Sequence, residues 1–521
     1  TSRLLDFPTS QLPNFPTSQL PNFPTSQLPN FPTSQLPNFS TPALPHSRTP
    51  ALPHSRTPAL PHSRTPALPH SRTPLTQITL AKALQSVQHS SMRLYSTNSP
   101  DTLVDFGEAV LRSLPSDNGL YMPEHIPTLD DAFWSDWKSL SFDDMACRVV
   151  STLLQGAIPE DKLTEIVKDA LNFPAPTIKL DHNHRVLELF HGPTLAFKDF
   201  GARFMARVMA WLTRDDDRPL AVLVATSGDT GGAVASAFLH VEGTRVIILY
   251  PSGKVSGLQE KQLTALGGNI TALEIDGSFD DCQRMVKAAF LDQETSLSCN
   301  LTSANSINIC RLIPQMLYYF EAARQTEKPP VFVIPSGNFG NLTALLLAAR
   351  MGLQVEHIVA ATNVNDVVPE YLKTSDYNPR PSVSTISNAM DVGAPSNFAR
   401  MKELFGNDWQ AMVDNISGFA ANDARTRTAI KAVYEKYSYI IDPHGAVGYL
   451  AAEAWLKDHP DDITIILETA HPAKFPETMI EELGDALLEI PERLACLADE
   501  PKVSITMAAD PDALITWLKN G

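Results

Sequence analysis

The pattern of apolar and polar residues changes twice along the chain. From about residue 185 onward, short apolar runs such as LAVLVATS (220–227), RVIILYP (245–251) and PVFVIPS (330–336) alternate with stretches of helical spacing. Continuous β-branched runs that alternate with helices are typical of a parallel sheet covered on both faces. This part of the sequence therefore predicts an α/β body with two lobes, each centred on a sheet.

The segment before this body has a different spacing. Apolar residues recur three and four positions apart, which predicts amphipathic helices. We expect a helical N-terminal domain over residues 92–175, followed by a catalytic domain over residues 176–521. A turn-rich connection, DNGLYMPEHIP, lies at 117–127. The three predicted helices span 105–114, 143–156 and 159–172.

The first 91 residues follow neither pattern. Residues 7–39 repeat FPTSQLPN and residues 41–74 repeat TPALPHSR. Proline at this density removes backbone donors and disfavours helix, so residues 1–91 are expected to form a disordered, low-complexity tail. The near identity of the repeats suggests a translated tandem DNA repeat, and our hypothesis is that the working protein begins near Met92. An organellar targeting segment is the less favoured alternative, because no amphipathic, Arg-rich helix is present.

Composition and charge limit the classes of function. The chain has 521 residues, of which 43% are hydrophobic, and its formal net charge is −17 at pH 7. An acidic protein repels nucleic acid and anionic membranes, so neither is an expected partner. Five cysteines without paired spacing indicate reduced thiols in the cytoplasm, with neither a metal site nor a disulfide framework. An anionic small substrate would then need a local cationic pocket.

One lysine lies in an unusually apolar segment. In HGPTLAFKDFGARF (191–204), Lys198 follows Phe197 and precedes Phe200 by two positions. Burial of an ammonium group is unfavourable, which leaves two interpretations. Either the side chain extends to solvent from a helix terminus, or its amine is needed uncharged and nucleophilic.

Three strand-to-helix turns carry groups suited to anions. In α/β folds, ligands bind at the carboxyl ends of the strands, where these turns lie. ATSGDTGGAV (225–234) exposes N–H groups that open a helix, and IPSGNFGN (334–341) brackets amide side chains with glycines, as in a nest for a phosphate dianion. ILETAHPAKF (466–475) presents Thr469 and Lys474. None of the three matches a Walker A or GxGxxG motif, which argues against ATP or a dinucleotide.

A lysine in an apolar segment, a phosphate nest and a second anion-binding turn together predict a pyridoxal 5′-phosphate (PLP) site. The PLP aldehyde reacts with a neutral amine, and an apolar setting lowers the pKa of a lysine. The phosphate of the cofactor needs one backbone cradle, and the carboxylate of the substrate needs another. We therefore predict that Lys198 binds the cofactor covalently and that Thr469 is a hydroxyl partner of the ring nitrogen.

Six motifs also carry a resemblance to a known family. In order they are HGPTLAFKDFG, ATSGDTGGA, SANSINICRLIPQ, IPSGNFGN, DPHGAVGY and TAHPAKF. Together they closely resemble the threonine synthases, PLP-dependent lyases with the tryptophan-synthase-β-like fold, from Met92 to the C-terminus. The resemblance implies conversion of O-phospho-L-homoserine and water to L-threonine and phosphate, the last step of threonine biosynthesis, by γ-elimination and β-addition.

The resemblance also implies roles for individual residues. Lys198 corresponds to the Schiff-base lysine, and the turn containing Ser227, Gly228 and Thr230 meets the substrate carboxylate. Asp229 stands where related enzymes of this fold often carry Asn. The implied cofactor-binding residues are Lys198, Asp229, Gly337, Asn338, Phe339, Gly340, Asn341 and Thr469.

The substrate phosphate needs cations of its own within an acidic protein. Arg311 is the first candidate, and a helix-surface salt bridge is the alternative interpretation of this residue. Lys474 is the second candidate. His191 and His444 are expected to be structural hydrogen-bonding residues. The remaining predicted substrate contacts are Ser303 and Asn308, with Asn305 nearby.

Three other functions remain open at this point. A phospho-lyase of the same fold would release 2-oxobutyrate, and a regulatory protein could retain the fold without catalysis. A dinucleotide-dependent oxidoreductase is disfavoured by the missing glycine motif. The expected partner is the small-molecule substrate alone, bound by a monomer or a homodimer.

Overall fold

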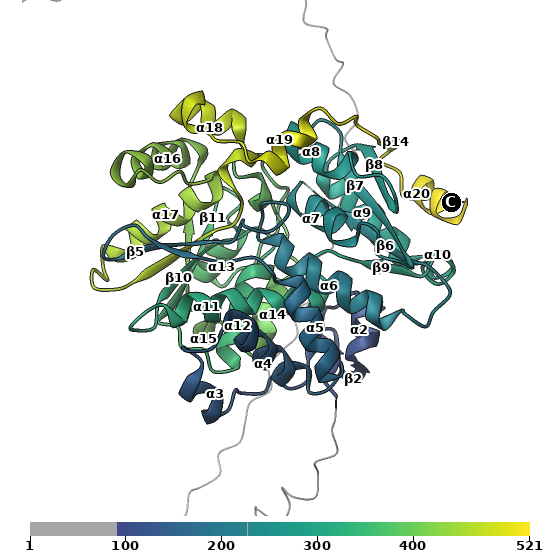
Figure 1. The fold of residues 1–521 in the computed structure, drawn as a ribbon, viewed down its shortest axis with the longest axis horizontal. Coiled ribbons are helices and arrows are strands. Elements are labelled where there is room, and N and C mark those ends of the chain that lie inside the picture. Colours follow the sequence, from purple (N-terminus) through teal and green to yellow (C-terminus); the bar gives the residue numbers. More distant parts are fainter. Residues whose placement is uncertain (1–90, 227, 521) are drawn as a thin grey trace, which may run out of the picture. The chain divides into compact units, whose positions relative to one another are not determined.

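A computed structural model describes residues 91–226 and 228–520, and these residues belong to one compact unit. Figure 1 shows their arrangement. Two predictions lie outside the described residues, namely the repeat tail (apart from its last residue) and the role of Ser227.

The N-terminal part contains the three predicted helices and, in addition, a small sheet. The sheet is antiparallel, in the order β2–β1–β3. The prediction of a mainly helical segment was therefore incomplete, because strands of three to seven residues leave too short an alternation to recognise. The elements are β1 (Arg93–Ser96), β2 (Ser99–Asp105), α2 (Phe106–Arg112), β3 (Tyr121–Pro123), α3 (Asp131–Asp136), α4 (Phe142–Leu154) and α5 (Glu160–Ala170).

The first lobe is centred on a five-stranded sheet in the order β14–β8–β7–β6–β9. All of its strand pairs are parallel, and β6 is buried along its whole length. Its strands are β6 (Leu220–Ala225), β7 (Thr244–Pro251), β8 (Ile270–Asp276), β9 (Leu301–Ser303) and β14 (Ile505–Ala508). Its helices are α7 (Asp229–Phe238), α8 (Gly257–Thr264), α9 (Phe279–Leu291), α10 (Gln293–Ser298) and α20 (Pro511–Asn520).

The second lobe is centred on a six-stranded sheet in the order β12–β11–β10–β13–β5–β4. Its strand pairs are parallel except for β4 and β5. The two sheet-centred lobes confirm the predicted α/β class. The strands are β4 (Thr177–Lys179), β5 (His184–Glu188), β10 (Val331–Pro335), β11 (His357–Thr362), β12 (Ile416–Ala420) and β13 (Thr464–Glu468).

Helices surround the second sheet and connect the lobes. Helix α6 (Lys198–Leu212) contacts α5 of the N-terminal part and α7 of the first lobe. Helix α17 (Pro443–Leu456) packs on β10, β11 and β13. The other helices are α11 (Leu317–Arg324), α12 (Gly340–Arg350), α13 (Val367–Thr374), α14 (Phe398–Leu404), α15 (Trp409–Val413), α16 (Asp423–Tyr437), α18 (Pro476–Leu483) and α19 (Glu492–Ala498). Five 3₁₀ turns are η1 (Ile309–Arg311), η2 (Ile313–Met316), η3 (Asn388–Met390), η4 (Pro472–Lys474) and η5 (Asp485–Leu487).

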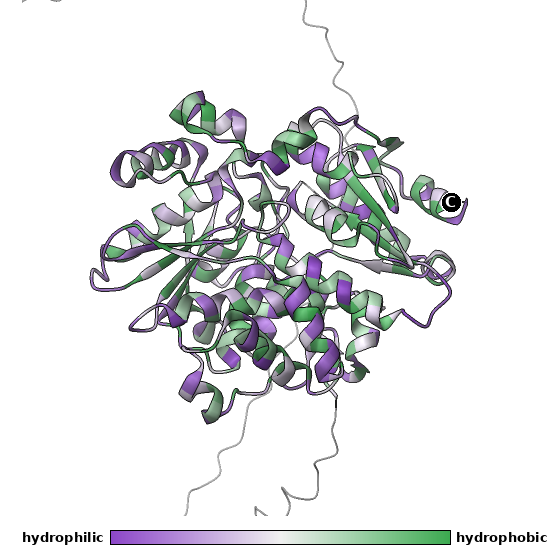
Figure 2. Cartoon of the chain, in the orientation of Figure 1, coloured by the Kyte–Doolittle hydropathy of each residue, from purple (hydrophilic) through white to green (hydrophobic). Residues whose placement is uncertain are grey.

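Hydropathy follows this layering. Figure 2 shows strongly hydrophobic strands in both sheets and helices of mixed hydropathy around them. Burial of apolar surface of this kind is the main favourable term in folding. Among the described helices, none combines the length and the apolarity that crossing a bilayer requires.

One glycine near the second sheet offers a test of this packing. A Cβ atom on Gly445 would lie 1.6 Å from the Oε2 atom of the buried Glu468. We expect Gly445→Ala to lower the free energy of unfolding by about 2 to 3 kcal/mol, because the buried site is already filled. Urea unfolding measures this difference.

The matched control is Gly257→Ala at the start of α8, where no atom lies within 4 Å of the added Cβ. This change should leave the free energy of unfolding unaltered or raise it by up to about 1 kcal/mol. Equal effects of the two substitutions would contradict the packing described for α17 against β13.

Candidate active site

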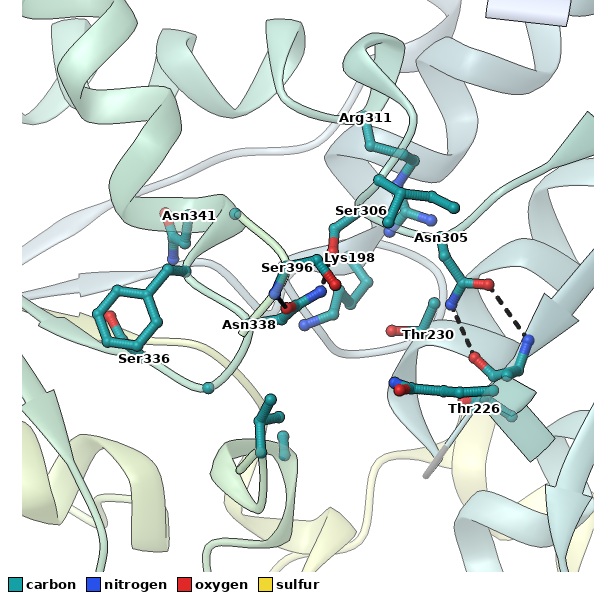
Figure 3. A pocket seen from close by; sticks show the side chains of 18 of the residues that line it. Lys198, Thr226, Thr230, Asn305, Ser306, Arg311, Ser336, Asn338, Asn341 and Ser396 are labelled. Atoms are coloured by element: carbon teal, nitrogen blue, oxygen red, sulfur yellow. Dashed lines mark hydrogen bonds between the residues drawn. The ribbon is translucent and has the colours of Figure 1, made fainter. Parts of the chain in front are cut away.

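The turns at the carboxyl ends of both sheets line one cavity of about 420 Å³. Thr226, Asp229 and Thr230 follow β6, and Thr469 follows β13. The loop 336–341 between β10 and α12 forms another wall. Figure 3 shows Lys198 in this cavity, between the loop that carries Asn338 and the turn that carries Thr230. The structure thus brings together the three turns and the lysine that the sequence singled out.

The end of β13 holds the segment that precedes Lys198. The Phe197 N–H donates to the Thr469 carbonyl oxygen at 2.9 Å, and the His471 N–H donates to the Leu195 carbonyl oxygen at 3.0 Å. Leu195 has a φ of +60°, in the left-handed region that a leucine seldom adopts. These backbone contacts fix the start of α6, of which Lys198 is the first residue.

The amine of Lys198 is in an environment that disfavours its charged form. Burial lowers its pKa from 10.5 to about 7. Asp229 acts in the opposite direction, whereas the positive charges of Arg311 and Lys474 lower the pKa further. The Phe197 ring, whose centre lies 3.9 Å from the Nζ atom, attracts the ammonium form and so acts in the same direction as Asp229. A large fraction of the amine is therefore neutral near pH 7, as the apolar sequence context predicted.

Loop 336–341 has the features of an anion cradle. No described residue accepts a hydrogen bond from the N–H groups of Gly337, Asn338 and Phe339. Phe339 has a φ of +58°, and the following residue begins α12. Successive N–H groups in such a turn, together with a helix N-terminus, bind phosphate. A Cβ atom on Gly337 would lie 2.5 Å from the Ala389 carbonyl oxygen, so only glycine fits.

Asn341 supplies a further unused donor to this cradle. Its Oδ1 atom accepts hydrogen bonds from the hydroxyls of Tyr318 and Tyr319, at 2.5 and 2.6 Å. Its buried Nδ2 atom has no hydrogen-bond partner among the described residues. A buried amide N–H without an acceptor is unfavourable, and an anion in the cavity would satisfy it.

The opposite wall is shaped by Thr226 and Asn305. The Thr226 Oγ1 atom accepts hydrogen bonds from the N–H groups of Gly228 and Gly231, at 3.0 and 2.8 Å. The Asn305 side chain donates to the Ala225 carbonyl oxygen at 2.7 Å and accepts from its N–H at 3.2 Å. These bonds hold the turn after β6 against the segment after β9.

Arg311 lies beside this wall and is fully buried. Its Nη1 atom donates to the Ala304 carbonyl oxygen at 2.5 Å, and burial lowers its pKa to about 10. No carboxylate lies within ion-pair distance of the guanidinium among the described residues. The alternative interpretation of Arg311 as a helix-surface salt bridge is therefore wrong, and a buried cation remains at the wall of the cavity.

Comparisons with known proteins identify the family of the chain. Residues 93–171 match the family described as the threonine synthase N terminus, residues 174–468 match the PLP-dependent enzymes, and residues 445–517 match the threonine synthase C-terminal family. The threonine synthase of Haemophilus influenzae is 46% identical over 431 residues, which cover 82% of this chain and 99% of that relative. The chain belongs to the threonine synthase family. PLP is therefore its cofactor, and its activity is that of a threonine synthase.

Solved structures of the family have the same fold. The crystal structure of the Escherichia coli threonine synthase is 43% identical, with a TM-score of 0.78, and the match covers 82% of this chain and all of that one. The PLP-bound threonine synthase from Brucella melitensis is 33% identical, with a TM-score of 0.76, and the match covers 82% of this chain and 99% of that one. The predicted PLP-dependent fold with two sheet-centred lobes is confirmed, and it is the fold type II of PLP-dependent enzymes.

The cavity fits the cofactor of this family on its own geometry. Lys198 offers an amine whose pKa burial lowers to about 7, and Thr469 lies on the cavity wall. The free N–H groups of residues 337–339 and the unpaired Nδ2 atom of Asn341 suit a phosphate dianion. All the residues that the sequence assigned to the cofactor line this one cavity.

Four predicted substrate contacts do not line the cavity, namely Gly228, Ser303, Asn308 and Lys474. The Gly228 N–H donates to Thr226 Oγ1. The Ser303 hydroxyl donates to Asn305 Oδ1, and the Asn308 amide donates to the carbonyl oxygens of Val110 and Ser303. Lys474 is fully buried against Asp229. A polar residue near the end of a strand can turn toward the protein or toward the cavity, and the sequence does not distinguish the two.

The two histidines form hydrogen bonds with protein groups. His191 lies 2.8 Å from a Glu188 carboxylate oxygen and does not line the cavity. His444 lines it, and its Nε2 atom accepts the Ala389 N–H at 3.2 Å. The proton is therefore on Nδ1, which lies 3.0 Å from the Asp442 carboxylate. This arrangement agrees with the expected structural role.

Several lining residues were missed by the sequence analysis. Thr226 and Ser306 lie next to motif residues that were chosen, so their motifs were a usable signal. Asp391 carried no such signal. Its carboxylate accepts hydrogen bonds from Thr385 and Asn363, while burial raises its pKa to about 6.

The glycine of the cradle gives a direct test of the phosphate site. We expect Gly337→Ala to raise the Kd for PLP at least tenfold, or about 1.4 kcal/mol, because the added methyl group displaces the loop from Ala389. Titration of the cofactor-free chain with PLP, followed by absorbance, measures this change. Gly257→Ala is the control and should not alter the Kd; an unaltered Kd for Gly337→Ala would contradict the assignment of the cradle.

Proposed function

We propose that the chain converts O-phospho-L-homoserine and water into L-threonine and phosphate, with the chemistry centred on Lys198. The observation that carries the proposal is the position of Lys198, whose pKa burial lowers to about 7, in one cavity with an anion cradle and a buried arginine. The substrate has a carboxylate, an amine and a phosphate, and the cavity offers a different group to each.

Lys198, Thr469, Asp229 and the loop 337–341 are the residues that would hold the cofactor. When bound, PLP stabilises negative charge at the carbon atoms next to the substrate amine. The protein supplies the position of the phosphate through the cradle, and it places the amine of Lys198 on the wall of the same cavity.

Lys198 is the proposed proton carrier. Its amine, with a pKa of about 7, can accept the Cα proton of the substrate and later return it. A base with a pKa near the working pH combines a useful neutral fraction with sufficient basicity. Lys198 is thus both the attachment point and the base in this proposal.

The proposed substrate contacts lie on the wall opposite the cradle. Thr230, in the first turn of α7, would bind the carboxylate through its N–H group. The Gly228 N–H donates to Thr226 Oγ1, so the proposal gives Gly228 the role of shaping this turn. Arg311 would bind the phosphate, together with Asn305 and Ser306, which line the cavity beside it. Ser303, Asn308 and Lys474 have protein partners, so the proposal gives them supporting roles.

The assembly and the compartment belong to the same proposal. We infer a monomer or a homodimer that works in the cytosol. The five cysteines are all unpaired in the structure, which agrees with a reducing compartment. Domain boundaries near residues 92 and 176 are likewise proposed, on the matches of separate families to residues 93–171 and 174–468.

Lys198→Ala tests the role of the lysine. We expect kcat to fall by about 10³-fold or more, because both the attachment point and the base are removed. The wild-type chain should release L-threonine and phosphate in equal amounts, as measured by product analysis. Release of 2-oxobutyrate by the wild-type chain would instead identify a phospho-lyase.

Arg311→Ala tests the phosphate contact. We expect KM for O-phospho-L-homoserine to rise by about tenfold or more, because a charged hydrogen bond to the phosphate is lost. The Kd for PLP should change much less, since Arg311 does not belong to the cradle. Arg284→Ala, which removes a half-exposed ion pair with Asp281, is the control; an unaltered KM for Arg311→Ala would exclude the proposed contact.

A further inference from the structure

A buried ion pair lies directly behind the cavity wall. The Lys474 side chain is fully buried, the Asp229 side chain is 7% exposed, and their Nζ and Oδ1 atoms are 2.5 Å apart. Lys474 belongs to the turn η4 after β13, and Asp229 is the first residue of α7. The pair thus joins the ends of two strands from different lobes.

Stability alone does not account for this pair. Removing two charges from water is unfavourable, and well-packed apolar residues in place of a buried ion pair often give the folded state equal or greater stability. Contact with the substrate does not account for it either, because Lys474 does not line the cavity. Asp229 does line it, together with Lys198. The pair therefore places a neutralised carboxylate beside the reactive amine.

The charges around Lys198 indicate what the pair does. Asp229 stabilises the ammonium form of Lys198, whereas Lys474 and Arg311 destabilise it. The other titratable groups that line the cavity are Asp391, His444 and Lys287. With Lys474 present, the carboxylate already has a cationic partner, so a proton on Lys198 would add an uncompensated buried charge. Without Lys474, the negative charge of Asp229 would lack that partner and would favour the protonated form of Lys198.

Lys474 also contacts the loop that leads to Lys198. Its Nζ atom donates to the Thr194 carbonyl oxygen at 3.0 Å, and the Gln262 amide donates to the same oxygen at 3.2 Å. The Thr194 N–H and hydroxyl in turn donate to the buried Asp199 carboxylate, at 2.8 and 2.7 Å. The ammonium group of Lys474 therefore contacts both the Asp229 carboxylate and the backbone of Thr194, four residues before Lys198.

We propose that Lys474 is a positioning residue that neutralises Asp229 and so keeps Lys198 uncharged and ready to bond to the cofactor. This inference rests on the proposed role of Lys198 as the attachment point. It assigns Lys474 to a task distinct from binding the substrate phosphate.

The test is the pH dependence of cofactor attachment in the full-length chain. The chain is freed of PLP, remixed with PLP between pH 5.5 and 10, and followed by the visible absorbance of the attached cofactor. The titrations of free PLP are common to all variants, so differences in the midpoint report on Lys198. Peptide mapping after reduction shows that the attachment is at Lys198.

The two single substitutions should move the midpoint pH of cofactor attachment, at which attachment is half of its maximum, in opposite directions. Lys474→Met should raise it by at least one pH unit, which slows attachment at pH 7 about fivefold or more, because the charge of Asp229 then favours the ammonium form of Lys198. Asp229→Asn should lower it, because the positive charge of Lys474 remains without a partner. The double variant Asp229→Asn, Lys474→Met should return close to the wild-type midpoint.

Two further variants separate charge from packing. Lys474→Arg keeps the positive charge and should keep the midpoint close to that of the wild type. Lys431→Met removes a lysine of α16 that pairs with Glu482 of α18, and it should leave the midpoint unaltered. Circular dichroism verifies that each variant is folded.

An unaltered or lowered midpoint in folded Lys474→Met would overturn the inference. A rise in the double variant equal to that in Lys474→Met would overturn it too. If Lys474→Met does not fold, Asp229→Asn decides, and a midpoint that does not fall would overturn the inference. A wild-type chain that binds no PLP, or binds it at another lysine, would instead refute the proposed function. The two failures are thus distinguishable.

Discussion

The removal of one amine from water is the constraint on which the site depends. A lysine in solution has a pKa near 10.5, so a neutral amine at pH 7 requires an environment that penalises its charge. The structure provides this environment by placing Lys198 at the first position of a helix whose preceding segment is bonded to the end of β13. The amine lies against the Phe197 ring and lines the cavity, where burial lowers its pKa. A flexible or exposed lysine at this position would be protonated and unreactive toward an aldehyde.

The remainder of the site follows from where the strands end. Parallel strands present their carboxyl ends at one edge, and in this protein the edges of two sheets face one cavity. Side-chain bonds join the segments from the two lobes. Asn305 binds the backbone of Ala225 within the first lobe, and the Asn338 amide donates to the Ser306 hydroxyl across the cavity wall at 2.8 Å. The anion cradle, the amine and the arginine consequently keep fixed positions relative to one another.

Much of this arrangement is predictable from the sequence. Long buried strands give continuous apolar runs, so the two lobes and the three turns could be recognised, and Lys198 was conspicuous as a charge among apolar residues. The antiparallel sheet at the N-terminus was missed, because RLYS and YMP are too short to display a period. The orientations of Ser303 and Asn308 could not be predicted, since polar residues near strand ends face either way. The pairing of Lys474 with Asp229 could not be predicted either, because it joins the ends of two strands that are remote in the sequence.

The account rests on a covalent bond between the cofactor and one named amine. Reduction of the purified chain with borohydride, followed by peptide mapping, tests this directly. The account predicts a single pyridoxyl-modified lysine, at position 198. A modification at another lysine, or a chain that remains colourless and takes up no added PLP, would contradict it.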